Sequence, residues 1–345
     1  MAKMKAAMMM GLENIVTGEM DVPEYGDDEV LVNIKHVGIC GADLEWYQHG
    51  RIGAWVLDFP HVLGHEPAGV IAEVGKNVTN VKVGDVVAIE PGKPCFTCDT
   101  CLRGKYNLCP NMIFMSCPGV SGSFCEYVAW PARLVFKVPD NMSTADACLA
   151  EPLAIGIHSV DQSGIQFGQS AAILGSGCIG LCVALALKAR GITEVYITDI
   201  APKRLEKAKE LGVTATINAA EQDVVKTITD MSGGGVDVVF ECSATQTAID
   251  QSIQLLNKGG MLTLIGMPSS PTMAFDVNGI LMKEAYISSI FRYRFDYPKA
   301  ISAIASGTAP ISKVVSHRFP VEKLGEAIEL NMADKNLVTK IVIEI

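Results

Sequence analysis

Four side chains in three separate stretches could bind a metal ion: Cys40, His65 with Glu66, and Glu151. Thiolate, imidazole and carboxylate are the ligand types of a zinc ion that keeps one position open for water or substrate. The spacing leaves a plainer alternative open, because the two glutamates could be surface residues and the histidine a hydrogen-bonded core residue. A catalytic zinc site is therefore a hypothesis at this point.

A second group of four cysteines lies within fifteen residues of one loop. The loop, about residues 91–111, is rich in proline and glycine and spaces its thiols as C-x2-C-x2-C-x7-C: Cys95, Cys98, Cys101 and Cys109. Four thiolates can close a tetrahedral shell around a structural zinc ion, which stabilises a lobe and performs no chemistry. Four unligated core cysteines, or an iron–sulfur cluster, are the alternatives.

A glycine motif, GSGCIG at 175–180, directly follows an apolar run and directly precedes a helical pattern. Glycines at these positions allow a tight turn and a close approach of the backbone to a pyrophosphate, whose charge the helix N-terminus favours. Asp199 ends the next predicted strand, where a carboxylate can accept hydrogen bonds from ribose hydroxyls and repel a 2′-phosphate. The pattern predicts NAD binding, although Asp199 could also cap the helix that starts near Pro202. The predicted contacts are Gly175, Gly177, Cys178, Ile179, Gly180 and Asp199.

Two regions with different sequence patterns must position these residues. Up to about residue 155, short alternating runs such as Val30–Ile34 and Val86–Ile89 are separated by turn residues, which predicts a β-rich domain. From about 170, strand and helix patterns alternate and provide six strands, which is the signature of a doubly wound parallel sheet. The tail from about 292 mixes helix and strand and is expected to rejoin the first domain.

Length and composition fit a globular protein of two domains. With 345 residues, 49% hydrophobic and 19% charged, the chain is too long for one ordinary core and is not disordered. Its net charge of −10 disfavours nucleic acid and anionic membranes as partners. Eleven cysteines, an odd number, favour a reducing compartment over a disulfide framework. We expect a cytoplasmic protein.

Two segments could be mistaken for membrane signals. The N-terminus has an apolar stretch but lacks a small-x-small cleavage site around Met10-Gly11-Leu12. The stretch from Gln162 to Leu187 carries no charge, but its glycine cluster predicts a buried strand, a turn and a helix instead of one spanning helix.

Taken together, these motifs resemble the zinc-containing medium-chain alcohol dehydrogenase family, and the resemblance covers nearly the whole chain. The stretch 64–78 is similar to that family's zinc signature. Within the family the chain looks most like the sorbitol (L-iditol) and xylitol dehydrogenases, through residues 49–53, 104–110, 151–153 and 291–293. The resemblance implies a GroES-like catalytic domain, 1–155 with 292–345, and a Rossmann NAD-binding domain, 156–291, with the active site in the cleft.

The resemblance also assigns roles. Cys40, His65 and Glu66 would hold the catalytic zinc, and Glu151 would be a fourth ligand or would act through the zinc water. Substrate contacts would come from Trp46, Phe114, Glu151, Arg292 and Tyr293. Further cofactor contacts would come from Arg204, Phe291 and Arg292.

The chain departs from the polyol dehydrogenases at three positions. They usually have Ser or Thr two residues after the zinc cysteine, as the first member of a proton relay, and here that residue is Ala42. Trp46 stands where relatives often have tyrosine, and Cys117 where they often have threonine. The proton would then leave through the zinc water with Glu151, or through Glu45, and the pocket would be less polar.

The resemblance implies one catalytic and one structural zinc per chain, a polyol or ketose substrate, and a homotetramer or homodimer. A threonine or butanediol dehydrogenase and a sugar-phosphate polyol dehydrogenase are the alternative enzymes. A quinone reductase-like or regulatory protein that keeps the nucleotide fold without catalytic zinc is the alternative of another class, but it should lack the Cys40, His65 and Glu66 set.

Overall fold

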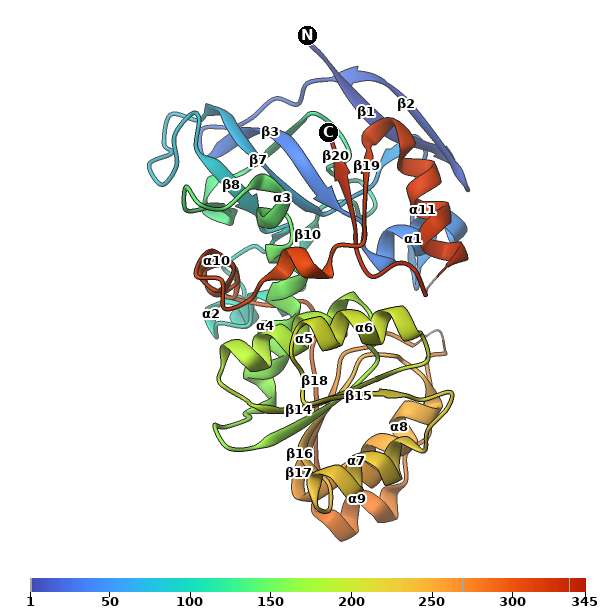
Figure 1. Cartoon of the computed structure of the whole chain (residues 1–345). Helices are drawn as coiled ribbons and strands as arrows, with labels where there is room; N and C mark the ends of the chain where they lie inside the picture. The colour runs from blue at the N-terminus through green and yellow to red at the C-terminus, as the bar shows by residue number, and fades with distance from the viewer. Residues whose placement is uncertain (1, 269, 335) are drawn as a thin grey trace. The chain divides into compact units, whose positions relative to one another are not determined.

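The computed structural model of the chain describes residues 2–268, 270–334 and 336–345. It divides into two compact units, Met1–Glu151 with Val315–Ile345, and Pro152–Val314 (Figure 1). We call them unit 1 and unit 2 and describe each by itself. They begin and end at other residues than the predicted domains, 1–155 with 292–345 and 156–291. The physical reason is that the chain between 292 and 314 is tied to unit 2, as described below.

Unit 1 is built on a seven-stranded sheet with the order β12-β8-β7-β3-β20-β19, in which β11 also pairs with β3. These strands are β3 (Glu29–Gly38), β7 (Glu66–Val74), β8 (Val86–Ile89), β11 (Tyr127–Pro131), β12 (Val135–Lys137), β19 (His317–Pro320) and β20 (Ile341–Glu344). The expected strands around Val30–Ile34 and Val86–Ile89 are present. The tail rejoins this unit, because β20 pairs antiparallel with β3 and places Val342 opposite Gly38.

Smaller elements complete unit 1. A three-stranded sheet and two short hairpin-like pairs consist of β1 (Lys3–Gly11), β2 (Asn14–Asp21) and β6 (His61–Val62), then β9 (Gly92–Lys93) with β10 (Ile113–Phe114), and β4 (Arg51–Ile52) with β5 (Trp55–Val56). The helices are α1 (Gly41–His49), α2 (Asp99–Leu102), α3 (Thr144–Ala147) and α11 (Leu324–Ala333), with 3-10 turns η1 (Tyr106–Leu108), η2 (Ala132–Leu134) and η4 (Val321–Lys323). A core of aliphatic and aromatic side chains fills the space between these elements, among them Val32, Ile71 and Phe124.

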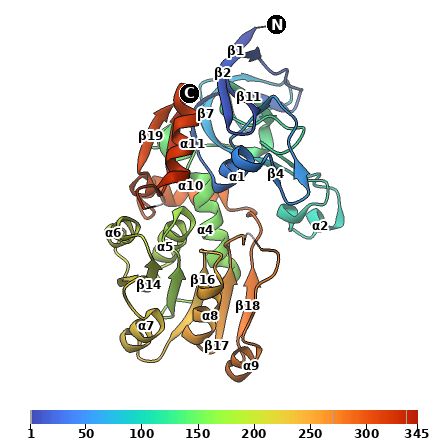
Figure 2. The ribbon, with the colours of Figure 1, turned by 90° about the vertical axis from the view of Figure 1, so that its right-hand side faces the viewer.

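Unit 2 is a six-stranded parallel sheet with the order β15-β14-β13-β16-β17-β18, which confirms the predicted doubly wound sheet. Figure 2 shows β16, β17 and β18 side by side. The strands are β13 (Ser170–Leu174), β14 (Glu194–Asp199), β15 (Ala215–Asn218), β16 (Val236–Glu241), β17 (Leu256–Leu264) and β18 (Tyr286–Ser289). The order reverses between β13 and β16, and ligands of such sheets bind at the carboxyl ends of strands at this point.

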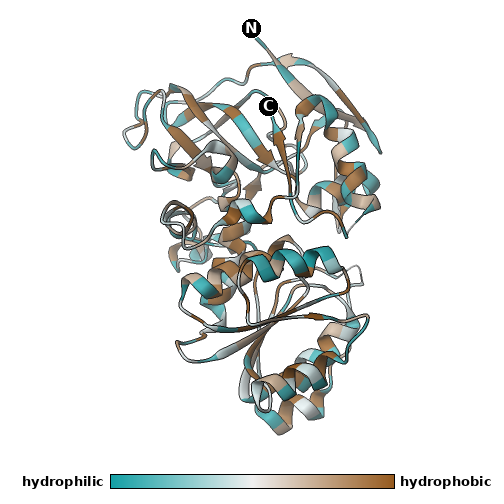
Figure 3. Cartoon of the chain, viewed as in Figure 1, coloured by the Kyte–Doolittle hydropathy of each residue, from teal (hydrophilic) through white to brown (hydrophobic). Residues whose placement is uncertain are grey.

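The crossovers of unit 2 are helical. They are α5 (Cys178–Ala189), α6 (Pro202–Glu210), α7 (Val224–Ser232), α8 (Gln246–Leu255) and α9 (Val277–Lys283), and α10 (Tyr297–Ala305) with η3 (Ile311–Val314) follows the last strand. α6 buries Leu205 and Ala208 and exposes most of its charged residues. Its many charged residues make it largely teal in Figure 3. α4 (Ala150–Ser163) begins at the last two residues of unit 1 and continues into unit 2.

The uncharged stretch from Gln162 to Leu187 contains the predicted strand and helix, β13 and α5, and it begins with the last two residues of α4. Among the residues that the structure describes, no helix combines the length and the apolar composition needed to cross a bilayer.

Candidate metal centres and dinucleotide loop

The structure brings Cys40, His65 and Glu66 together in unit 1. Cys40 directly precedes α1, His65 directly precedes β7, and Glu66 is the first residue of that strand. One donor atom from each side chain lies within 4.8 Å of the others. Glu66 pairs in register with Gly38 of β3, and a Cβ at Gly38 would collide with the Glu66 carboxylate. The β3–β7 pairing and this glycine therefore position the site.

Asp43, which we had not predicted as a site residue, ties the segments of this site together. Its side chain is fully buried; Oδ2 accepts a hydrogen bond from the Cys40 amide at 2.9 Å, and Oδ1 accepts one from the Gly64 amide at 3.1 Å. The same Oδ1 lies 3.7 Å from His65 Nδ1. A carboxylate behind an imidazole orients the ring and makes it a better metal ligand. The acid at the third position of a helix is a capping pattern that could have indicated Asp43 from the sequence.

The charges of the site favour a cation. Burial lowers the pKa of His65, but the Cys40 thiolate and the Asp43 carboxylate beside it raise that pKa well above its usual range. Burial is the largest cause that raises the pKa of Cys40, and the neighbouring His65 opposes it. A buried thiol is a poor ligand until a positive charge compensates its thiolate, which a zinc ion does.

Lys340 is the second residue of the site that we had not predicted. It lies just before β20; its Nζ donates to Glu66 Oε1 at 2.6 Å and to the Ile39 carbonyl at 2.9 Å. Both side chains of this ion pair are at most 3% exposed. Glu66 Oε2 lies 2.5 Å from the ammonium but accepts no well-aligned hydrogen bond within the described part of the chain, so it keeps a lone pair for a cation. Only the return of the tail to β3 brings Lys340 here.

Glu151 is buried in the first turn of α4. It does not belong to the group of described side chains whose donor atoms gather within 4.8 Å. Its role as a fourth ligand or as a carboxylate that acts through water thus stays a prediction.

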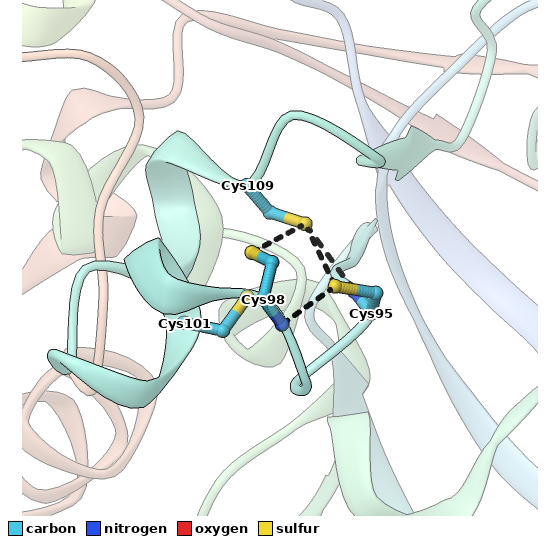
Figure 4. Close-up of side chains that lie close together, drawn as sticks. All are labelled: Cys95, Cys98, Cys101 and Cys109. Carbon is cyan, nitrogen blue, oxygen red and sulfur yellow. Dashed lines mark hydrogen bonds between the residues drawn. The ribbon is translucent and has the colours of Figure 1, made fainter.

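The four cysteines of the 91–111 loop also converge. Figure 4 shows the side chains of Cys95, Cys98, Cys101 and Cys109 turned toward one another, and their sulfurs lie within 4.8 Å of one another. The amides of Cys95 and Cys98 each donate to a sulfur of the group at 3.4 Å. Hydrogen bonds from Thr97 and from the Cys98 amide lower the pKa of Cys95 to about 5, whereas burial raises the pKa of Cys101 to about 12. Four convergent thiols with amide donors suit a closed tetrahedral metal site.

Local packing supports the four-cysteine lobe. Phe96, between the first two cysteines, has a left-handed φ of 57°, and the Arg133 guanidinium lies 3.5 Å from its ring centroid. Tyr106 stacks at a tilt on Phe96 and donates its hydroxyl to Glu90 Oε1 at 2.9 Å. These contacts link the loop to Arg133 and to Glu90.

In unit 2 the glycine motif joins β13 to α5. Gly175 has a φ of 108°, which side-chain-bearing residues rarely adopt, and a Cβ at Gly180 would collide with the Gly175 carbonyl. Helix α5 begins at Cys178, so the motif lies at a strand-to-helix turn as predicted. This is the geometry in which backbone amides and the helix N-terminus accept a pyrophosphate.

Asp199 ends β14 and has a structural task besides the predicted one. Its Oδ2 accepts from the Ser176 amide at 2.8 Å, and its Oδ1 accepts from the Ala201 amide at 2.9 Å. Ser176 in turn donates its hydroxyl to the Arg204 carbonyl. An Arg204 Nη1 lies 3.7 Å from where a Cβ of Gly177 would be, so this guanidinium borders the loop. Asp199 therefore holds the glycine loop, and its contact with a ribose stays a prediction.

The predicted substrate residues lie in different surroundings. Phe114, in β10, packs against His65 with ring centroids 5.6 Å apart and the ring planes tilted by 56°, and it thus borders the candidate metal site. Trp46 is 2% exposed and belongs to the core of unit 1, so a substrate contact stays a prediction. In unit 2 the Arg292 guanidinium lies 4.7 Å from the centroid of the Phe291 ring, and Tyr293 is buried against Tyr297.

Two known protein families match parts of this chain. Residues 26–140 match the alcohol dehydrogenase GroES-like domain, and residues 178–306 match the zinc-binding dehydrogenase family. A sorbitol dehydrogenase of Bacillus subtilis is 40% identical over 343 residues, covering 99% of this chain and 97% of the relative.

Two solved structures are similar over the whole chain. The 2R,3R-butanediol dehydrogenase of Bacillus subtilis superposes with a TM-score of 0.92 at 32% identity, covering 99% of each chain. A zinc-binding dehydrogenase of Sinorhizobium meliloti, bound to NADP, superposes with a TM-score of 0.93 at 30% identity, covering 100% of each chain.

Proposed function

The chain belongs to the zinc-containing medium-chain alcohol dehydrogenases, and we propose that it oxidises a secondary hydroxyl of a polyol to a ketone with NAD as hydride acceptor. The observation that carries the proposal is the convergence of Cys40, His65 and Glu66 in a buried site with Asp43 behind the imidazole. Three protein ligands of mixed type leave one position for a substrate hydroxyl. The identity of the polyol rests on the similarity to sorbitol dehydrogenases.

Each residue of the site has a task in this reaction. Zinc, when bound, supplies a Lewis acid that lowers the pKa of the substrate hydroxyl. Cys40, His65 and Glu66 would hold the metal, Asp43 orients the imidazole, and Lys340 compensates the charge of Glu66. The glycine loop and Asp199 would hold the pyrophosphate and ribose of NAD, which would supply the hydride acceptor.

We assign the movement of the hydroxyl proton to the Glu151 carboxylate, because Ala42 cannot begin a hydroxyl relay. A buried carboxylate at the start of a helix is a suitable proton acceptor. Replacing Glu151 with glutamine should slow turnover and change its pH dependence. Unchanged turnover with an unchanged pH profile would remove Glu151 from the mechanism.

NAD is the proposed cofactor instead of NADP because Asp199 places a carboxylate at the end of β14. Arg204 borders the same loop and could accept a 2′-phosphate if that carboxylate were absent. The ratio of kcat/KM for NAD to that for NADP measures the preference. An Asp199→Ser variant should lower this ratio at least tenfold, and a wild-type preference for NADP would contradict the assignment.

A substrate panel tests the polyol. NADH production should be measured separately with D-sorbitol, xylitol, galactitol, 2R,3R-butanediol, L-threonine and a phosphorylated polyol as substrates. The proposal predicts the highest kcat/KM for an unphosphorylated polyol. The similarity to butanediol dehydrogenase, together with Ala42 and Cys117 in place of hydroxyl residues, favours a butanediol-type alcohol as the second candidate.

The zinc content separates the enzyme from a nucleotide-binding module without catalytic zinc. We propose one catalytic zinc at Cys40, His65 and Glu66 and one structural zinc at the four cysteines. Metal analysis should then find close to two zinc ions per chain. One zinc per chain and no dehydrogenase activity would favour the binding module.

We further propose a homodimer or homotetramer in the cytoplasm. β18 is an edge strand of the unit 2 sheet, and it exposes Tyr286 and Ile287, while α9 exposes Leu281 and Met282 at 72% and 80%. An exposed apolar edge of this kind is usually covered, and a second copy could pair there about a two-fold axis. Light scattering after gel filtration should give at least twice the chain mass, and an Ile287→Lys variant should lower it.

A further inference from the structure

The segment that links β18 to α10 has a conformation that the chain does not adopt without support. It starts at Ile290, whose amide donates to the Leu264 carbonyl at 3.1 Å, and it ends at Asp296. Between them Arg292 and Phe295 have left-handed φ angles of 56° and 59°. A left-handed backbone is energetically unfavourable for a residue with a side chain, and it persists only where surrounding contacts enforce it.

Asp296 holds the end of this segment in place through its hydrogen bonds. It is 1% exposed, and its Oδ2 accepts from the imidazole Nδ1 of His158 at 3.0 Å and from the Arg294 amide at 3.2 Å. Its Oδ1 accepts from Lys299 Nζ at 2.7 Å. Since a carboxylate only accepts, the Nδ1 of His158 carries the proton in this contact.

The network of hydrogen bonds around Asp296 extends to helix α4. Lys299 Nζ also donates to Asp161 at 2.6 Å, and Asp161 accepts from Arg190 at 2.6 Å. His158 and Asp161 are one turn apart on α4. His158 contacts Asp296 directly, whereas Asp161 is linked to Asp296 through Lys299. His158 is 3% exposed, whereas Lys299 and Arg190 are partly exposed.

The electrostatics of Asp296 agree with a stable tie. Burial raises its pKa, but the hydrogen bonds and charges of His158 and Lys299 outweigh burial, so that the pKa lies below its usual range. The carboxylate is therefore ionised and accepts from all three donors at neutral pH. Removing the His158 imidazole would take one hydrogen-bond donor away from the buried Asp296 carboxylate, which lowers the stability of the fold.

We propose that His158 and Asp296 form a clamp that positions Arg292 and Tyr293 for the cofactor and the polyol. His158 is a positioning residue in this account, because it acts through Asp296 and the strained backbone and not by touching a reactant. The proposal rests on the proposed function, in which Arg292 and Tyr293 contact the ligands. It adds two residues on separate elements, α4 and the turn before α10, that the zinc and glycine motifs do not include.

The test compares His158→Leu, which removes the donor, with His158→Asn, whose amide can replace Nδ1–H. The dissociation constant of NADH, followed by its fluorescence, and the KM for the best polyol of the panel are the readouts. We expect His158→Leu to raise both about tenfold, the equivalent of about 1.4 kcal/mol, with a smaller change in kcat. His158→Asn should restore values near those of the wild type.

A matched control separates positioning from general stability. Asp237 also ties elements of unit 2, because its Oδ2 accepts from the amide and the hydroxyl of Ser170, but it lies at the amino ends of β13 and β16. Asp237→Asn and Asp296→Asn make the same chemical change, the first in strand β16 and the second at the end of the 290–296 segment. Both should lower the melting temperature, but only Asp296→Asn should weaken NADH binding.

If His158→Leu does not fold, Lys299→Met replaces it, since the Lys299 side chain is 51% exposed and its removal cuts one bond of the clamp. Arg292→Ala tests the underlying assignment. If Arg292→Ala weakens ligand binding and the clamp variants do not, the clamp is wrong and the proposed function stands. If Arg292→Ala has no effect, the clamp has nothing to position and the proposal fails, while the substrate panel decides the proposed function independently.

Discussion

The two candidate metal centres of unit 1 are built in opposite ways. The four-cysteine site would take all its ligands from Cys95–Cys109, and neighbouring amides donate to two of the sulfurs. The second site would take its ligands from residues 40, 65 and 66, which the buried Asp43 ties together, and Lys340 from the other end of the chain pairs with Glu66. The difference teaches that a closed structural site can be local, whereas an open site with mixed ligands depends on tertiary structure.

The largest expected effect on catalysis comes from removing a ligand of the open site. His65→Ala should lower kcat/KM about a thousandfold or more, because several kcal/mol of Lewis-acid stabilisation are lost. Zinc analysis should show one ion per chain instead of two, and NADH binding in unit 2 should persist. A variant that keeps both zinc ions and its turnover would show that the catalytic metal is elsewhere.

The closed site should respond in the opposite manner. Cys98→Ser should lower the free energy of unfolding by a sizeable part of the roughly 10–16 kcal/mol that structural zinc sites contribute in small domains. The melting temperature with and without chelator is the measurement. Protein that is still folded should turn over nearly as fast as the wild type, so a loss of turnover without a loss of stability would contradict the assignment.

Lys340 sharpens the comparison, since the closed site has no counterpart to it among the described contacts. Lys340→Met should destabilise the zinc-free protein by about 3–5 kcal/mol, because it leaves the buried Glu66 charge without its partner. Zinc can compensate that charge, so the loaded variant should lose much less. The measurement is the melting temperature of the wild type and of Lys340→Met, each with zinc bound and after zinc removal.

The control for Lys340→Met is the double variant Lys340→Met with Glu66→Gln, which removes both charges. It should recover much of the stability of the stripped protein. An equal loss in loaded and stripped Lys340→Met would mean that Lys340 stabilises the fold and not the charge balance of the site.

The smallest effect is expected at the edge of the closed site. Arg133→Ala removes the guanidinium that covers Phe96 and should cost about 0.5–1 kcal/mol, which is typical of an exposed cation–π contact. Thermal unfolding measures it, and zinc content and turnover should not change. Loss of zinc from this variant would show that the lobe depends on more than its own loop.

The same contrast explains how much the sequence predicts. The four cysteines and the glycine motif are short-range patterns, and the six strands of unit 2 follow from alternating strand and helix runs, so all of these were predictable. Lys340 precedes an apolar strand and gives no sign of its partner, because Glu66 is far away in sequence. The left-handed φ of Arg292 and the tie between His158 and Asp296 likewise arise only from packing, as does the limit of unit 2 at Val314.

The open coordination position is the central claim, and cobalt substitution tests it most directly. With Co²⁺ in both sites, the visible absorption bands report the ligands of each ion separately when Cys98→Ser and His65→Ala are used to assign them. The best polyol of the panel should shift the bands of the site at Cys40, His65 and Glu66 and leave those of the four-cysteine site unchanged. Bands that stay constant at both sites while the same polyol is oxidised would contradict the account.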